Sequence, residues 1–98
     1  MPYIKQEMRN EIDEKINYLI HAIDAATEEN QLDGCLNYVI TKMVKHFYVD
    51  GVDQGGIPVT NYFHLNRAIG LLECVKTEFE RRVVAPYETQ KEFENGDV

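Results

Sequence analysis

The sequence has only two cysteines and no tryptophan, and its apolar residues never form a long uninterrupted run. Cys35 and Cys74 stand in unrelated contexts, without a CxxC pair or a Cys/His spacing typical of metal sites. Two reduced thiols in a cytoplasmic protein are therefore favoured over a disulfide. No segment approaches the ~20 apolar residues of a membrane span. The first residues lack an apolar stretch after their charges, so no signal peptide is expected.

The charge of the chain is negative and unevenly distributed. The net charge is −7, which argues against general nucleic-acid binding. Residues 1–34 carry a net charge of −5, residues 35–85 carry +1, and residues 86–98 carry −3. Any site for an anion is therefore expected in the middle of the chain.

Three stretches of helical periodicity dominate the rest. The 98 residues, 44% of them hydrophobic, are expected to form one globular domain. Apolar residues recur at intervals of three and four, which predicts helices over about 10–29, 33–48 and 60–85. Asn10 and Thr60 are the expected caps of the first and third helices. The fold class predicted is all-α, a three-helix bundle with a long third helix.

A glycine-rich loop and a short tail complete the expected organisation. The loop, residues 49–59, has no preceding strand and no following GKS or GKT, so a flexible linker is favoured over a phosphate cradle. Pro86 is expected to end the third helix, because proline disfavours helix at the residue before it. Residues 86–98 would then be a tail, with one further turn around Gln90 to Phe93.

Two polar lines on the second and third helices mark the candidate site. Asn66, Gly70 and Glu73 share the face opposite the apolar stripe. Gly70 inside a helix costs roughly 1 kcal/mol relative to alanine, so a closely packed helix or a bound molecule is expected to cover it. A similar line on the second helix consists of Asn37, Thr41, Lys45 and Tyr48. The alternatives are that both lines face water or that Asn37 and Asn66 hydrogen-bond in the core.

If a ligand occupies this place, it is expected to be a small anion with a nucleotide-like base. Arg67 and Arg81 would supply positive charge. Glu73 would accept a hydrogen bond from a ribose or base, and Tyr38 or Tyr87 would stack on the base. The predicted ligand-binding set is Asn37, Tyr38, Thr41, Asn66, Arg67, Gly70, Glu73, Arg81 and Tyr87.

No catalytic centre is predicted. The three histidines are scattered, without an HExxH motif. Glu11 and Glu14 form an ExxE pair, but no second acidic pair faces it in the way that helical magnesium-dependent pyrophosphatases require. We therefore expect a non-enzymatic protein without a metal ion or a cofactor.

Three segments, "LNYVIT", "NRAIGLLECVKTEFERRVVAPYE" and "ENGDV", together with the opening "MPYI", resemble one known family. Its members are small uncharacterised helical proteins of tailed phages, prophages and prokaryotes. The resemblance spans most of the chain and implies a phage-linked setting. The family has no established biochemical activity, so the resemblance assigns no role to any residue.

Two functions from different classes follow from these features. The first is a homo-oligomer that binds or sequesters a nucleotide-like immune signal, by analogy of size and class with small helical phage proteins. The alternative is a helical module that docks on a host or phage protein. Tyr62, Phe63 and Phe79 are the expected intersubunit contacts, because the long third helix offers more apolar surface than two shorter helices can cover.

Overall fold

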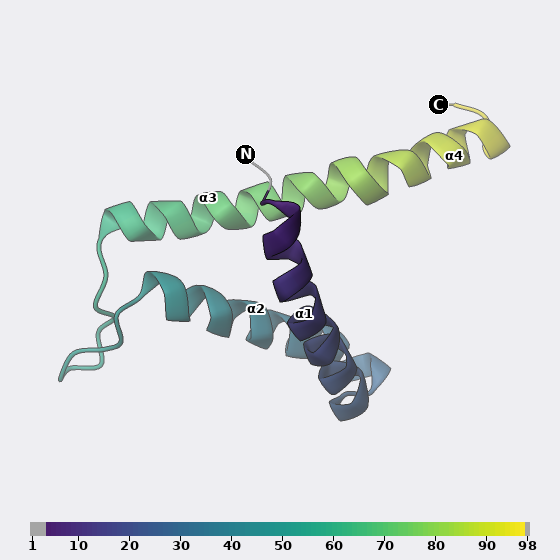
Figure 1. Ribbon diagram of the computed structural model, residues 1–98. Helices are drawn as coiled ribbons and strands as arrows, with labels where there is room; N and C mark the ends of the chain where they lie inside the picture. The colour runs from purple at the N-terminus through teal and green to yellow at the C-terminus, as the bar shows by residue number, and fades with distance from the viewer. Residues whose placement is uncertain (1–3, 98) are drawn as a thin grey trace. The chain divides into compact units, whose positions relative to one another are not determined.

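The computed structural model describes residues 4–97, and over this range the chain is built from helices (Figure 1). The elements in chain order are α1 (Gln6–Ala26), a 3₁₀ turn η1 (Glu29–Gln31), α2 (Leu32–Tyr48), α3 (Tyr62–Phe79), a π-helical segment η2 (Glu80–Val84) and α4 (Ala85–Asn95). No strand is found between residues 4 and 97, apart from one isolated bridge between Val52 and Pro58. The predicted all-α class with a long third helix is confirmed.

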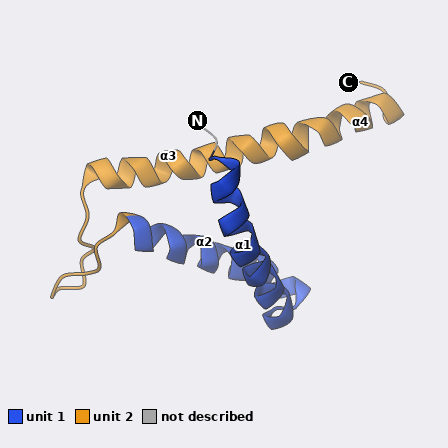
Figure 2. Ribbon diagram, in the orientation of Figure 1, with its two compact units in different colours: residues 1–47 blue, residues 48–98 orange. Residues whose placement is uncertain are grey.

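The chain divides into two compact units, which are coloured separately in Figure 2. The first unit, residues 1–47, holds α1 and nearly all of α2. The second unit, residues 48–98, holds the glycine-rich loop and the continuous run of α3, η2 and α4. That the three predicted helices make one domain stays a prediction.

The first helix begins earlier than its sequence indicated. Asn10 was expected to cap it, but α1 starts at Gln6, and the Asn10 side chain accepts a hydrogen bond from Gln6 Nε2 at 2.9 Å inside the helix. Arg9 Nε also donates to Ile4 O at 3.0 Å. These local bonds extend the helix past the predicted start. At the other end α1 stops at Ala26, where the Thr27 hydroxyl donates to Ile23 O at 2.8 Å.

The turn between α1 and α2 is fixed by a capping box. The Glu28 side chain accepts from the Gln31 backbone N–H, and Gln31 Oε1 accepts from the Glu28 N–H at 3.0 Å. The Gln31 N–H also donates to Glu28 O at 2.9 Å, and the Glu28 N–H gains a partner that the start of a helix would otherwise not provide. The second helix therefore begins at Leu32, one residue before the predicted start, and ends at Tyr48 as expected.

The glycine-rich loop contains its own hydrogen-bonded structure. Asp50 N donates to Val59 O and Asp53 N donates to Ile57 O, at 2.8 and 2.9 Å. Asp53 Oδ1 accepts from the backbone N–H groups of Gly55 and Ile57, at 2.9 and 3.0 Å. The segment is a loop, as predicted, but these bonds give it the form of a short hairpin.

The cap of α3 is Asn61, so the prediction of Thr60 was wrong by one residue. Asn61 Oδ1 accepts from His64 N at 2.9 Å, which satisfies a free N–H group of the first turn. The Thr60 hydroxyl donates instead to Tyr48 O, at 3.0 Å. This bond joins the end of α2 to the start of α3 across the hairpin loop.

Pro86 does not end the third helix. The run continues to Asn95, so the predicted boundary at residue 85 and the predicted tail from 86 onward were wrong. The physical reason lies in η2, where the Ala85 N–H donates to Glu80 O, five residues back. This wider turn opens the backbone just before the proline, which then enters as the second residue of α4. The helix ends at Asn95 and is capped by Gly96, which has a φ of +85°.

Little of the apolar surface is covered within the described residues. Ala68 is the one buried hydrophobic residue there, with 6% exposure. Side chains of the predicted stripes, including Ile16 on α1, Ile40 on α2 and Phe79 on α3, are exposed. Among the described helices, none combines the length and the hydropathy of a membrane span.

Candidate functional site

The polar line on α2 borders a hollow of about 470 Å³. Three of the predicted ligand-binding residues, Asn37, Tyr38 and Thr41, lie along it. The Thr41 hydroxyl donates to Asn37 Oδ1 at 3.1 Å, so the two side chains hold each other in place. The full lining is Gly34, Asn37, Tyr38, Thr41, Lys42 and Lys45.

Lys42 and Lys45 belong to this site, although the predicted set did not include them. Lys42 Nζ lies 3.4 Å from the Tyr38 hydroxyl oxygen and 5.5 Å from the centre of its ring. The signal was present in the sequence, because Lys42 follows Tyr38 by four residues and Lys45 follows Thr41 by four. Residues four apart share one face of a helix. The hollow therefore combines two ammonium groups with an aromatic ring, an amide and a hydroxyl.

The line of Asn66, Gly70 and Glu73 lies on an exposed face of α3. Glu73 forms an ion pair with Lys76 at 3.8 Å, in which both side chains are well exposed. An added Cβ atom at Gly70 would meet no described atom within 4 Å beyond its own helix. Its own unit therefore places no close neighbour over Gly70. The approach of Asn37 and Thr41 to this face stays a prediction.

Arg67 is held by two aromatic rings of its own unit. Its Cζ atom lies 5.6 Å from the ring centres of both Tyr48 and Phe63, within the range of cation–π attraction. Tyr48 is half-buried, and its carbonyl accepts the bond from Thr60. No ion pair of Arg67 is found among residues 4–97. The guanidinium retains N–H donors for an anion.

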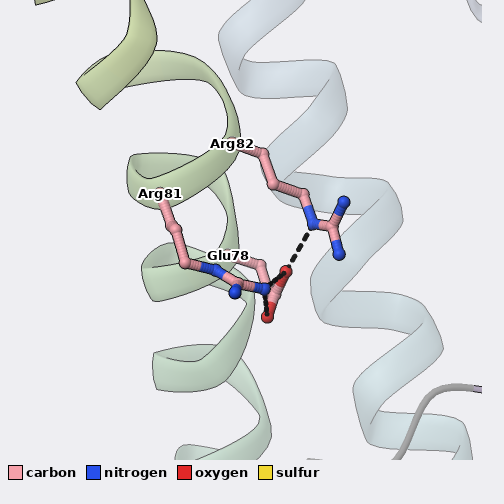
Figure 3. Close-up of polar contacts among 3 residues, drawn as sticks. All are labelled: Glu78, Arg81 and Arg82. Atoms are coloured by element: carbon pink, nitrogen blue, oxygen red, sulfur yellow. Dashed lines mark hydrogen bonds and ion pairs between the residues drawn. The ribbon is translucent and has the colours of Figure 1, made fainter.

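Arg81 is already engaged by a carboxylate. Its Nη2 atom contacts both oxygens of Glu78, at 2.9 and 3.0 Å, and Arg82 Nε donates to the same carboxylate at 2.7 Å (Figure 3). An incoming anion would have to compete with Glu78 for both arginines. Exposed pairs of this kind contribute only about 0.2–1 kcal/mol each. Competition is therefore possible, but Arg81 is a poorer anion site than the lysines of α2.

Tyr87 lies beside a second hollow, of about 410 Å³, near the end of α4. Lys91 Nζ lies 5.5 Å from its ring centre. The lining also contains Glu88, Glu92 and Asp97, so acidic groups predominate and an anionic ligand is disfavoured there. The structure thus brings Asn37, Tyr38 and Thr41 together, and places Tyr87 in a separate, acidic environment.

No metal centre is apparent in the part of the chain that the structure describes. No group of three or more histidine, cysteine, aspartate or glutamate side chains there has the arrangement of a metal site. Cys35 and Cys74 are free thiols, each half-buried.

The fold and these exposed polar groups define a small all-α protein with a lysine-lined polar hollow on α2. The chain belongs to the family of the domain of unknown function DUF6899, whose profile matches residues 1–98. This finding confirms the predicted membership in an uncharacterised family. No curated protein and no solved structure matches the chain.

Replacing Gly70 by alanine tests whether anything covers this face of α3. We expect the variant to be more stable by about 1 kcal/mol, because alanine favours the helix interior and the added Cβ meets open space. Thermal unfolding followed by circular dichroism measures the change. A loss of stability in Gly70→Ala would contradict the open face and restore the expectation of a closely packed neighbour.

Proposed function

We propose that this protein is a non-enzymatic, homo-oligomeric helical protein that binds a small anionic, nucleotide-like ligand on α2. The observation that carries the proposal is the hollow along α2, where two lysines adjoin an aromatic ring and a hydrogen-bonded Asn37–Thr41 pair. This set matches the chemistry of a nucleotide, which has a flat base, hydroxyl groups and phosphates.

Each side chain of the hollow has a distinct role in this proposal. Lys42 and Lys45 contact the phosphate groups through charge-assisted hydrogen bonds. Tyr38 stacks on the base through its exposed ring. The Oδ1 atom of Asn37 accepts from Thr41, and this bond fixes the orientation of the amide. The N–H₂ group of the same amide can then donate to the ligand.

The biological setting that we propose is phage-associated. Sequestration of a nucleotide-derived immune signal requires tight binding without turnover, which accords with a site made of lysines, an amide and a hydroxyl.

A thermal-shift panel of cyclic nucleotides and ADP-ribose derivatives tests the proposal. A ligand at a hundredfold excess over its Kd stabilises the folded state by about 2.7 kcal/mol. For a domain of this size, such a gain raises the melting temperature by roughly 10–20 °C. A panel in which no compound raises the melting temperature would contradict the proposed ligand class.

The alternative function is a helical module that docks on a host or phage protein. The observation in its favour is the exposure of large aromatic side chains, above all Phe93 at 93%. Binding of a single protein in a fixed ratio, lost on Phe93→Ser but kept on Lys42→Ala, would favour this alternative. The reverse pattern, with loss of nucleotide binding on Lys42→Ala only, favours the ligand-binding function.

A further inference from the structure

The run of α3, η2 and α4 carries an apolar face that its own unit leaves open. Val75, Phe79 and Val83 follow one another at intervals of four residues, so they lie on one side of the helix. Their exposures are 55%, 59% and 49%. Three large apolar side chains in a row at this exposure mark an interaction surface rather than scattered surface residues.

We propose that this face pairs with the same face of a second copy of the chain, in an antiparallel arrangement. The inference rests on the homo-oligomer of the proposed function and specifies its surface and its symmetry. A two-fold axis near Phe79 would bring the three apolar side chains of each copy together. Such an isologous contact buries the same patch on both partners.

The length of this helical run favours a second copy as the occupant. The run from Tyr62 to Asn95 comprises α3, η2 and α4, with 18, 5 and 11 residues, and spans about 51 Å at 1.5 Å per residue. The other helices, α1 and α2, have 21 and 17 residues, so they span only about 32 and 26 Å. The same helical run in a second copy of the chain is a partner of equal length.

The distribution of charge favours the antiparallel orientation. The half from Tyr62 to Thr77 has a net charge of +1, and the half from Glu78 to Asn95 has −2. An antiparallel pair places each basic half beside the acidic half of its partner. A parallel pair would place the two acidic halves together. The helix dipoles also oppose each other in the antiparallel pair, which is the favourable arrangement.

The sedimentation mass of a Phe79→Glu variant tests the surface. The unaltered protein is expected at twice 11.4 kDa at micromolar concentration, and Phe79→Glu at the single mass, because two carboxylates would face each other near the axis. Tyr18→Glu is the matched control. It places the same charge on an equally aromatic, exposed position of α1 and is expected to keep the double mass. A monomeric unaltered protein, or a dimeric Phe79→Glu, would overturn the proposal.

The distance between two spin labels tests the orientation without disturbing the apolar face. One label replaces Gln90, on α4, in a variant with Cys35→Ser and Cys74→Ser. An antiparallel pair with its axis near Phe79 separates the two labels by about 33 Å along the helix, whereas a parallel pair brings the helices within roughly 10 Å at that point. A short distance would overturn the antiparallel arrangement even if the mass is doubled.

Ligand binding to the Phe79→Glu variant separates this inference from the proposed function. Nucleotide binding by the monomeric variant would support the α2 site independently of the proposed dimer. A dimer of the unaltered protein that binds no nucleotide would support the surface and contradict the ligand.

Discussion

Reversing the charges of Lys42 and Lys45 together is expected to abolish binding of anionic nucleotides. Each lysine would supply a charge-assisted hydrogen bond worth about 1.5–3 kcal/mol. The loss of both corresponds to about 3–6 kcal/mol, or two to four powers of ten in Kd. Glutamates at these positions also repel the phosphates. Isothermal titration of the Lys42→Glu, Lys45→Glu variant with the tightest compound of the panel measures the effect.

The control for this variant must change the net charge equally. Lys5→Glu with Lys15→Glu makes the same change on exposed positions just before and within α1. This pair is expected to alter Kd by less than about tenfold, because exposed charges at a distance are screened by salt. Equal losses in the two double variants would show that overall charge, and not the α2 site, governs binding.

Replacing Pro86 by alanine is expected to stabilise the protein by about 2 kcal/mol. A proline inside a helix destabilises the folded state by about 3 kcal/mol. Removing it also makes the unfolded chain more flexible, which lowers the stability by about 0.4–1 kcal/mol and so reduces the net gain. Alanine would restore a backbone donor next to η2, so that the π-helical turn can relax to a regular α-helix. Thermal unfolding should show a rise of roughly 8–16 °C in melting temperature.

Thr89→Ala provides the comparison for Pro86→Ala. It lies one turn further along α4 and changes only intrinsic helix propensity, worth about 0.7 kcal/mol at most. A gain in Pro86→Ala no larger than that of Thr89→Ala would show that η2 already removes the strain of the proline. A loss of stability would show that the proline holds a required bend.

The sequence predicted the helices best where their signals are local. The apolar spacing of α2 predicted that this helix ends at Tyr48, which is where it ends in the structure. The all-α class followed from the same kind of periodicity. The predicted start of α1 was wrong because asparagine is a favoured N-cap residue, whereas Asn10 lies inside the helix and accepts a hydrogen bond from Gln6.

Pro86 was misread because the rule that proline ends a helix assumes regular α-helical pairing. The structure departs from that pairing at η2, where Ala85 N–H reaches Glu80 O. A switch from four-residue to five-residue pairing depends on backbone geometry over a whole turn. No side chain of "ERRVVAP" marks it in the sequence.

Part of the candidate site could also be predicted from helical spacing. Asn37 and Thr41 were placed on one face, and their side chains do form a hydrogen bond. The same spacing placed Lys45 on this line, although the predicted ligand-binding set left it out, and Lys42 could have been added because it follows Tyr38 by four residues. Arg81 was predicted from its positive charge alone, whereas in the structure Glu78, three residues earlier, contacts both Arg81 and Arg82 directly.

A titration of the isotope-labelled protein with ADP-ribose or a cyclic nucleotide, followed by amide NMR, shows whether the hollow on α2 binds the proposed ligand. We expect saturable shifts centred on the amides of the residues that line the hollow, which are Gly34, Asn37, Tyr38, Thr41, Lys42 and Lys45. The same titration of Lys42→Glu, Lys45→Glu should leave these amides unmoved. Saturable shifts confined to α4, or no shifts with any compound that the panel selects, would contradict the binding site on α2.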